Sequence, residues 1–188
     1  MNAPGLGYRP EANLFPLLDG AEFEALKADI AANGLLEPIW LHPDGRILDG
    51  RNRYRACQAL GVEPRFRTWN GYGSAVKFVW SLNAARRHLS PGQKAMAAAD
   101  MLPILEEEAR DRQATSTGGP SPQLREIIPE AAKGRAREQA AEMVGVNDRY
   151  VQEAKRRQQA APDLGAEVRE GKKNIPWARR VLAERESQ

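Results

Sequence analysis

Apolar positions in the first part of the chain follow two different periods. Residues 22–33 carry apolar side chains at helical spacing and end at an Asn-Gly pair, a pattern that predicts an amphipathic helix. Residues 38–41 and 46–48 are short apolar runs on either side of a Pro-Asp-Gly turn, which predicts a β-hairpin. Residues 65–69 alternate between polar and apolar side chains and predict a third strand.

Helical periodicity returns in three further segments. Residues 51–60 repeat an apolar side chain every three positions and precede Gly61, a typical helix-ending residue. Residues 75–87 predict another helix. A Ser-Pro pair then precedes the alanine-rich segment 93–110 in the pattern of a capped helix start.

The remaining sequence divides into a linker and a helical part. Residues 113–130 are rich in Ser, Thr, Gly and Pro and have little that could pack. Residues 135–159 and 163–186 predict helices. We therefore expect an α+β protein with an N-terminal domain over 1–112, this linker, and an all-α domain over 131–188.

The composition excludes several classes of protein. The chain has 188 residues, 41% hydrophobic and 28% charged, and no window of about 18 apolar residues that could span a membrane. Its start lacks the basic and apolar regions of a signal peptide. The single cysteine, Cys57, excludes an intramolecular disulfide and a multi-cysteine zinc site. We expect a cytoplasmic protein.

Positive charge is concentrated in the C-terminal part. Residues 131–188 hold 13 Lys and Arg against 9 Asp and Glu, a net of +4, whereas residues 1–130 hold 15 against 16, a net of −1. A local positive surplus favours a polyanion partner, because Lys and Arg on phosphates release condensed counterions. A solvated basic face is the alternative meaning of the same surplus.

The segment around Gly145 has the spacing of a helix-turn-helix. Ala141 is a small residue where the two helices come closest, and Gly145, four positions later, can adopt the positive φ of a tight turn. An ordinary αα-hairpin is the alternative, but the spacing and the charge together favour DNA binding. Five apolar residues fall where the motif buries side chains between its helices: Ala140, Val144, Val146, Val151 and Ala154.

Candidate DNA contacts lie along the second helix of this motif. Asn147 can cap the helix through its side-chain oxygen. The chemistry of Arg149 and Gln152 suits base edges in a major groove. The cations Lys155, Arg156 and Arg157 are expected to reach phosphates.

A second candidate site lies in the string ILDGRNRYRA, which has the order strand, Asp-Gly turn and helix start. Backbone N–H groups at a helix start are unpaired and favour anions, phosphates especially. Arg51, Arg53 and Arg55 add positive charge there. Neither the P-loop signature nor GxGxxG occurs in the chain, so any nucleotide must be held differently.

Three strings, followed by the helix-turn-helix, resemble the ParB/Spo0J partition family. They are LLEPIWLHPDG, ILDGRNRYRA and LNAARRHLSPGQKA, and the resemblance covers most of residues 20–185. It implies a small mixed-sheet ParB/sulfiredoxin-like N-terminal domain that binds a nucleotide, CTP or another NTP, ahead of a helix-turn-helix domain that binds double-stranded DNA.

The resemblance also implies which residues hold the phosphates. The family's GERRxRA segment starts here at Gly50 and keeps Gly50 and Arg53, whereas Arg51 replaces its glutamate and Asn52 replaces its first arginine. All four residues are candidate nucleotide contacts by resemblance.

The family's ENxxRxxLxP segment supplies the remaining implied contacts, Asn83, Arg86 and Arg87, with Asn83 helping to hold a magnesium ion. The glutamate that this family ties to CTP hydrolysis is Leu82 here. A leucine can neither polarise water nor bind a metal, so the resemblance does not imply hydrolysis by the partition-protein mechanism.

Sulfiredoxins share the implied fold but place a catalytic cysteine in a segment that corresponds to residues 49–53, where this chain has Arg51. Cys57 lies further along the same predicted helix. We expect it to be a core residue rather than a redox centre.

The leading hypothesis is a ParB-like regulator or accessory DNA-binding protein, cytoplasmic and associated with the nucleoid. Partition proteins end in a separate dimerisation domain for which no room follows residue 188, so a homodimer would need another surface. Two alternatives stay open: a ParB-fold nuclease, NTPase or small-molecule kinase using Asp49 or Glu37 as metal ligand or base, and a nucleotide-free adaptor.

Overall fold

The computed structural model describes residues 6–84, 88–115 and 128–187, with side chains described outside 112–134. The chain forms two compact units, Met1–Leu82 and Asn83–Gln188. This division lies earlier than the predicted domain end at residue 112. The reason is helix α4 (Pro91–Thr115), which packs against α6, α7 and α8 of the second unit.

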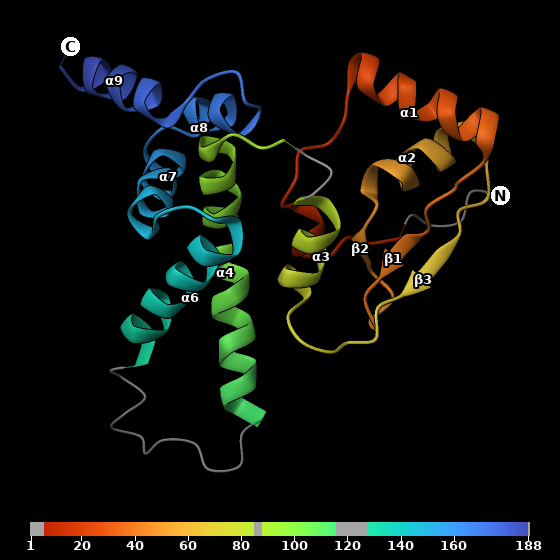
Figure 1. Ribbon diagram of the computed structural model, residues 1–188, viewed down its shortest axis with the longest axis horizontal. Helices are drawn as coiled ribbons and strands as arrows, with labels where there is room; N and C mark the ends of the chain where they lie inside the picture. The colour runs from red at the N-terminus through yellow and green to blue at the C-terminus, as the bar shows by residue number, and fades with distance from the viewer. Residues whose placement is uncertain (1–5, 85–87, 116–127, 188) are drawn as a thin grey trace. The chain divides into compact units, whose positions relative to one another are not determined.

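The first unit combines a three-stranded sheet with helices (Figure 1). Strand β1 (Ile39–Leu41) lies in the centre, pairs antiparallel with β2 (Ile47–Asp49) and parallel with β3 (Phe66–Thr68). The predicted hairpin and third strand are thereby confirmed. The helical elements are η1 (Pro10–Asn13), α1 (Gly20–Asn33), α2 (Arg51–Leu60) and α3 (Ala75–Ala84).

The hydrophobic core of the first unit forms between the sheet and helices α1 and α2. Tyr54 and Cys57 of α2 are buried against Ile39 of β1 and Ile47 of β2, and Ile30 of α1 joins them. Phe23 and Leu26, two further apolar residues of α1, are partly buried against this cluster. Cys57 is therefore a core residue, as expected.

The second unit is entirely helical where it is described. Helix α4 is followed by α6 (Ile128–Val144), α7 (Asp148–Ala160), α8 (Pro162–Arg169) and α9 (Ile175–Glu186). Helices α4 and α6 extend into both ends of the predicted linker. Pro129 does not prevent this because it lies in the first turn of α6, where no intrahelical N–H is required. Residues 116–127 of the linker lie outside the described residues.

Helix α4 begins with a reciprocal cap. Ser90 Oγ accepts from the Gln93 N–H at 3.3 Å, and Gln93 Oε1 accepts from the Ser90 N–H at 3.1 Å. This capping box satisfies two donors that the helix start would leave unpaired. It confirms the predicted start at the Ser-Pro pair.

Asp100 of α4 joins the helices that follow. Its Oδ1 accepts from Gln158 Nε2 of α7 at 2.6 Å and from Arg169 Nη2 of α8 at 2.8 Å. Burial raises the pKa of Asp100, although the charge of Arg169 and the Gln158 hydrogen bond oppose that shift. Asp100 therefore fixes α7 and α8 on α4.

The predicted α+β class is confirmed by the mixed sheet and the surrounding helices. Over the described residues, no helix has both the length and the apolar character needed to cross a membrane.

Candidate functional site

The turn between α6 and α7 has the geometry that the sequence predicts. Gly145 adopts a φ of 69°, in the left-handed region that favours glycine. The Val146 N–H donates to the Ala141 carbonyl at 3.0 Å, and the Gly145 N–H donates to the Glu142 carbonyl at 3.2 Å. These two bonds close α6 in the manner of a Schellman motif and turn the chain within three residues.

Helices α6 and α7 pack through small and β-branched side chains. Four of the five side chains predicted to be buried here are buried, namely Ala140, Val144, Val151 and Ala154, whereas Val146 is only half-buried. Ala141 is also buried, which lets the two backbones approach closely. Arg137 Nε lies 3.4 Å from Asp148 Oδ2, an ion pair that spans the turn.

Asn147 caps α7 as predicted. Its Oδ1 accepts from the Arg149 N–H at 2.8 Å, and its backbone is extended, as for a typical N-cap residue. The cap fixes where the helix starts and thereby where Arg149 projects.

An Asn147→Ala variant is expected to lose about 1 kcal/mol of unfolding free energy, because the first turn of α7 loses its side-chain acceptor. Urea unfolding followed by circular dichroism measures the loss. The matched control is Gln159→Ala, an exposed position near the other end of the same helix, which should change stability by less than about 0.5 kcal/mol. Equal stability of the two variants would contradict the capping role.

The predicted DNA-contacting residues differ in how accessible they are. Arg149 and Arg156 are exposed, whereas Gln152 and Lys155 are half-buried. Arg157 pairs with Glu153 at 3.5 Å, and its side chain is only 18% exposed. Arg157 is therefore less available for a phosphate than the other cations of α7.

A hollow of about 470 Å³ lies at the start of α7. Tyr150, which is not among the predicted contacts, lines this hollow. Burial raises the pKa of the Tyr150 phenol, and the charge of nearby Glu153 raises it further. Nothing in the sequence around Tyr150 indicated that this residue lies beside the candidate DNA contacts. The other lining residues are Pro91, Gly145, Val146, Asn147, Arg149 and Glu153.

At the second candidate site, Gly50 and Arg53 form a tight corner. Gly50 is the N-cap of α2, with a φ of 99° and no side-chain cap. A Cβ on Gly50 would lie 3.0 Å from Arg53 Nη2, 3.1 Å from Arg53 Nε and 3.4 Å from the Ile39 Cα. The guanidinium thus lies directly over the helix start, in a space that only glycine leaves free.

Arg53 is held in this position by Asp49. Its Nη2 donates to Asp49 Oδ2 at 2.9 Å, and both side chains are largely buried. The buried Arg53 Nε has no hydrogen-bond partner within the described part of the chain. A donor of this kind, beside uncapped backbone N–H groups, suits an anionic oxygen.

The other polar residues at the start of α2 contact the segment before α1. Arg51 donates to Asn13 Oδ1 and, at 2.7 Å, to the Phe15 carbonyl. Asn52 Oδ1 accepts from the Leu18 N–H at 3.0 Å, and Arg55 Nη1 donates to the Leu18 carbonyl at 3.0 Å. Arg51 and Asn52 therefore anchor residues 13–18 to the start of α2.

The remaining nucleotide candidates lie at the end of α3 and beyond it. Asn83 is half-buried and belongs to the second unit, as α3 ends two residues past the division. Arg86 and Arg87 lie outside the described residues. Leu82, the position of the family's glutamate, is half-buried in α3.

Cys57 follows Arg53 by four positions and lies on the same face of α2, one turn further from Gly50. It is fully buried, and burial raises the pKa of its thiol against the opposing charge of Arg53. A thiol with a raised pKa is a poor nucleophile.

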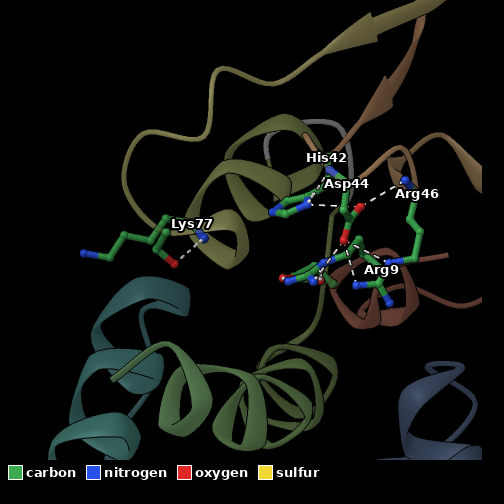
Figure 2. A network of polar contacts seen from close by, with 7 residues as sticks. Arg9, His42, Asp44, Arg46 and Lys77 are labelled. Atoms are coloured by element: carbon green, nitrogen blue, oxygen red, sulfur yellow. Dashed lines mark hydrogen bonds and ion pairs between the residues drawn. The ribbon is translucent and has the colours of Figure 1, made fainter. Parts of the chain in front are cut away.

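Asp44 is the centre of a polar network at the hairpin turn. Figure 2 shows it among His42, Arg46 and Arg9, with Arg46 Nη2 at 2.7 Å and Arg9 Nη1 at 3.4 Å from Oδ2. Partial burial disfavours its charge, but hydrogen bonds from Arg46 and His42 prevail and hold the pKa of Asp44 well below its usual range. Its stabilising effect is therefore present at neutral pH and is lost only as the pH falls into the acid range.

The two catalytic candidates, Glu37 and Asp49, have different surroundings. Glu37 is exposed in the loop before β1, and Asp49 is engaged by Arg53. Among the described residues, no three His, Cys, Asp or Glu side chains gather into a group that could hold a metal ion.

No protein-family model matches the chain, and no curated protein matches it. Among solved structures, a Pnob8-like ParB-N domain matches with 14% identity and a TM-score of 0.55, covering 95% of this chain and 76% of that chain.

Two structures of C-terminally truncated chromosome-partitioning protein ParB from Caulobacter crescentus also match. The one complexed with CTP-gamma-S has 19% identity and a TM-score of 0.36, covering 95% of this chain and 87% of that chain. The one complexed to the centromeric parS site has 20% identity and a TM-score of 0.39, covering 90% and 78%. Because both TM-scores are low, the fold assignment rests on the first neighbour. The chain therefore has the fold of a ParB-N domain structure, as its sequence motifs implied.

Proposed function

We propose that the chain is a ParB-like DNA-binding protein. Helices α6 and α7 form its helix-turn-helix and recognise a specific duplex, and the first unit binds a nucleotide, CTP or another NTP, that alters conformation or assembly. The observation that supports this most directly is the turn at Gly145, which leaves Arg149 exposed at the start of a capped helix.

Recognition of DNA would follow from the position of α7. The N-terminal residues of a recognition helix contact base edges in the major groove. Arg149 has the fork geometry for the O6 and N7 atoms of guanine, and Gln152 can pair with adenine. Lys155 and Arg156 would contact phosphates, with Arg157 contributing least because Glu153 holds it.

Binding of a nucleotide is supported by the corner at Gly50. The uncapped start of α2 and the Arg53 guanidinium present donors to one small space, and phosphate oxygens are acceptors of matching charge. By resemblance, Arg51, Asn52, Asn83, Arg86 and Arg87 would contribute further contacts, with Asn83 helping to hold Mg²⁺.

As a partition or transcription-regulating protein, the chain would act on the nucleoid in the cytoplasm, as a homodimer if a second copy binds. This biological setting follows from the proposed DNA binding and the ParB-N fold.

Selection of duplexes from a random library, followed by affinity measurements, tests the proposed DNA contacts. Arg149→Ala should relax the preference at one base position at a cost of about 1 to 3 kcal/mol, because a bidentate base contact is lost. Lys155→Ala should weaken all duplexes alike and lower the salt dependence of binding by about one phosphate contact. Arg110→Ala, an exposed cation of α4, is the matched control.

Two results would contradict the proposal. Absence of any duplex binding at low salt would remove the DNA-binding function. Absence of heat in calorimetric titrations with CTP, ATP, GTP and UTP would remove the nucleotide site and favour a nucleotide-free adaptor. Magnesium-dependent nucleotide turnover or DNA nicking that vanishes on Asp49→Ala would instead favour an enzyme.

A further inference from the structure

A second hollow in the helical unit lies outside the candidate DNA contacts of α7. It has a volume of about 900 Å³ and opens between the start of α4, the loop after α8 and the first turns of α9. We call it the α9 groove. Its lining includes Ser90, Lys172, Lys173, Trp177, Arg179 and Arg180.

The α9 groove is cationic. Four of its lining residues are Lys or Arg, and among the described residues that line it none is Asp or Glu. Arg179 and Arg180 are exposed, and neither forms an ion pair with any residue that the structure describes. Lys173 Nζ lies 5.4 Å from the centroid of the Trp177 ring, whereas Lys172 pairs with Glu170 outside the groove at 2.7 Å.

The walls of the α9 groove belong to packed elements. Ile175, Ala178 and Leu182 of α9 are buried, and Asn174 caps α9 by accepting from the Trp177 N–H at 2.9 Å. Gln93 Nε2 donates to the Arg169 carbonyl at 3.2 Å, which fastens the start of α4 to the end of α8. The cations therefore project from a fixed surface.

The α9 groove adjoins the hollow at the start of α7. Pro91 lines the α7 hollow and Ser90 lines the α9 groove, so consecutive residues at the start of α4 separate the two. Both hollows belong to one compact unit and meet at the start of α4, which is the arrangement that a ligand spanning both would need.

We propose that the α9 groove binds the phosphodiester backbone of the same duplex whose major groove receives α7. A helix in the major groove lies between two phosphate strands, so a cationic surface beside its start meets one of them. The absence of carboxylates from the described lining suits a polyanion. This inference rests on the proposed DNA binding and adds a second, sequence-independent contact that would fix the orientation of α7.

The test compares two triple variants of the full chain. The groove variant carries Lys173→Gln, Arg179→Gln and Arg180→Gln. The control carries Lys27→Gln, Lys77→Gln and Arg110→Gln and removes the same charge elsewhere. Affinity for the selected duplex is measured from 50 to 200 mM salt, base preference by library selection, and folding by circular dichroism.

If each groove cation neutralises one phosphate, the slope of log affinity against log salt should fall by about 2.7 in the groove variant, at about 0.9 per contact. Over this fourfold salt range the wild type would then lose about 40-fold more affinity than the groove variant. The preferred sequence should stay the same, and the control should keep the wild-type slope.

Other outcomes overturn the inference. An unchanged slope in a folded groove variant shows that the groove does not contact phosphates of this duplex. An equal fall in slope in both variants shows a general charge effect rather than a contact made by the groove. If the wild-type chain binds no duplex, the proposed function itself fails.

Discussion

A Met96→Ala variant is expected to lose about 2 to 5 kcal/mol of unfolding free energy in the second unit. Met96 is fully buried in α4. A Cβ on Gly165 of α8 would lie 3.3 Å from Met96 Cε and 3.4 Å from the Cα of Gln158 in α7. The methionine end therefore fills the space where α4, α7 and α8 meet, and its removal leaves a cavity.

Hydrogen exchange followed by mass spectrometry measures this loss, because it reports protection of α4, α7 and α8 separately from the first unit. Since α7 carries Arg149, a loosened α7 should also bind the selected duplex with less sequence preference. Glu107→Ala, an exposed position on α4, is the matched control and should stay within about 0.5 kcal/mol of the wild type. Unchanged protection in Met96→Ala would show that the three helices do not depend on this side chain.

The elements that the sequence predicts best are those with local turn chemistry. The hairpin follows from the Pro-Asp-Gly turn, and α2 runs from Arg51 to Leu60 because Gly50 and Gly61, both with positive φ, bound it. The start of α7 follows from the Gly145 turn and the Asn147 cap in the same way. In each case, the residues that determine the structure lie within a few positions of one another.

Longer-range features were not predictable from local patterns. The parallel pairing of β1 with β3 joins residues separated by all of β2 and α2. The apolar pattern of α4 indicates a helix but not its neighbours, so it does not show that α4 packs with the helices that follow it, in the unit that begins at Asn83. Packing partners depend on the shape of distant surfaces, which spacing along one helix does not encode.

The same limit applies to the candidate site. The string ILDGRNRYRA places four polar side chains at the start of α2. Their roles differ because each contacts a different part of the chain, which the string itself does not show. Arg53 turns toward Asp49 and Gly50, whereas Arg51 and Asn52 contact residues 13–18. Charge in a sequence therefore indicates where a polyanion could bind, but the positions of neighbouring segments decide which cations are free to do so.

A Gly50→Val variant is expected to lose about 2 to 6 kcal/mol of unfolding free energy in the first unit. A β-branched residue at a φ of 99° is strained by about 1 to 3 kcal/mol. Its Cβ would also crowd the Arg53 guanidinium and the backbone of Ile39, which is fully buried in the central strand, at a further cost of about 1 to 3 kcal/mol.

Gly45→Val separates these two effects. Gly45 has a φ of 83°, close to that of Gly50, but a Cβ there would meet no atom within 4 Å. The control therefore loses stability through backbone strain alone. The difference in unfolding free energy between the two variants measures the crowding around Arg53.

Gly50→Val should also weaken nucleotide binding more than Gly45→Val does. Gly50→Val displaces the Arg53 guanidinium from the start of α2, so the affinity for CTP, measured by calorimetry at a temperature where both variants are folded, should fall about 10-fold or more, the worth of one charge-assisted hydrogen bond. Gly45→Val should bind CTP as the wild type does, because its turn lies at the other end of β2 from Arg53.

Equal CTP affinities in the two folded variants would show that the corner at Gly50 holds no phosphate. Equal stabilities would show that the corner is not crowded. The two measurements together therefore distinguish a site built for a ligand from a tight turn that serves the fold alone.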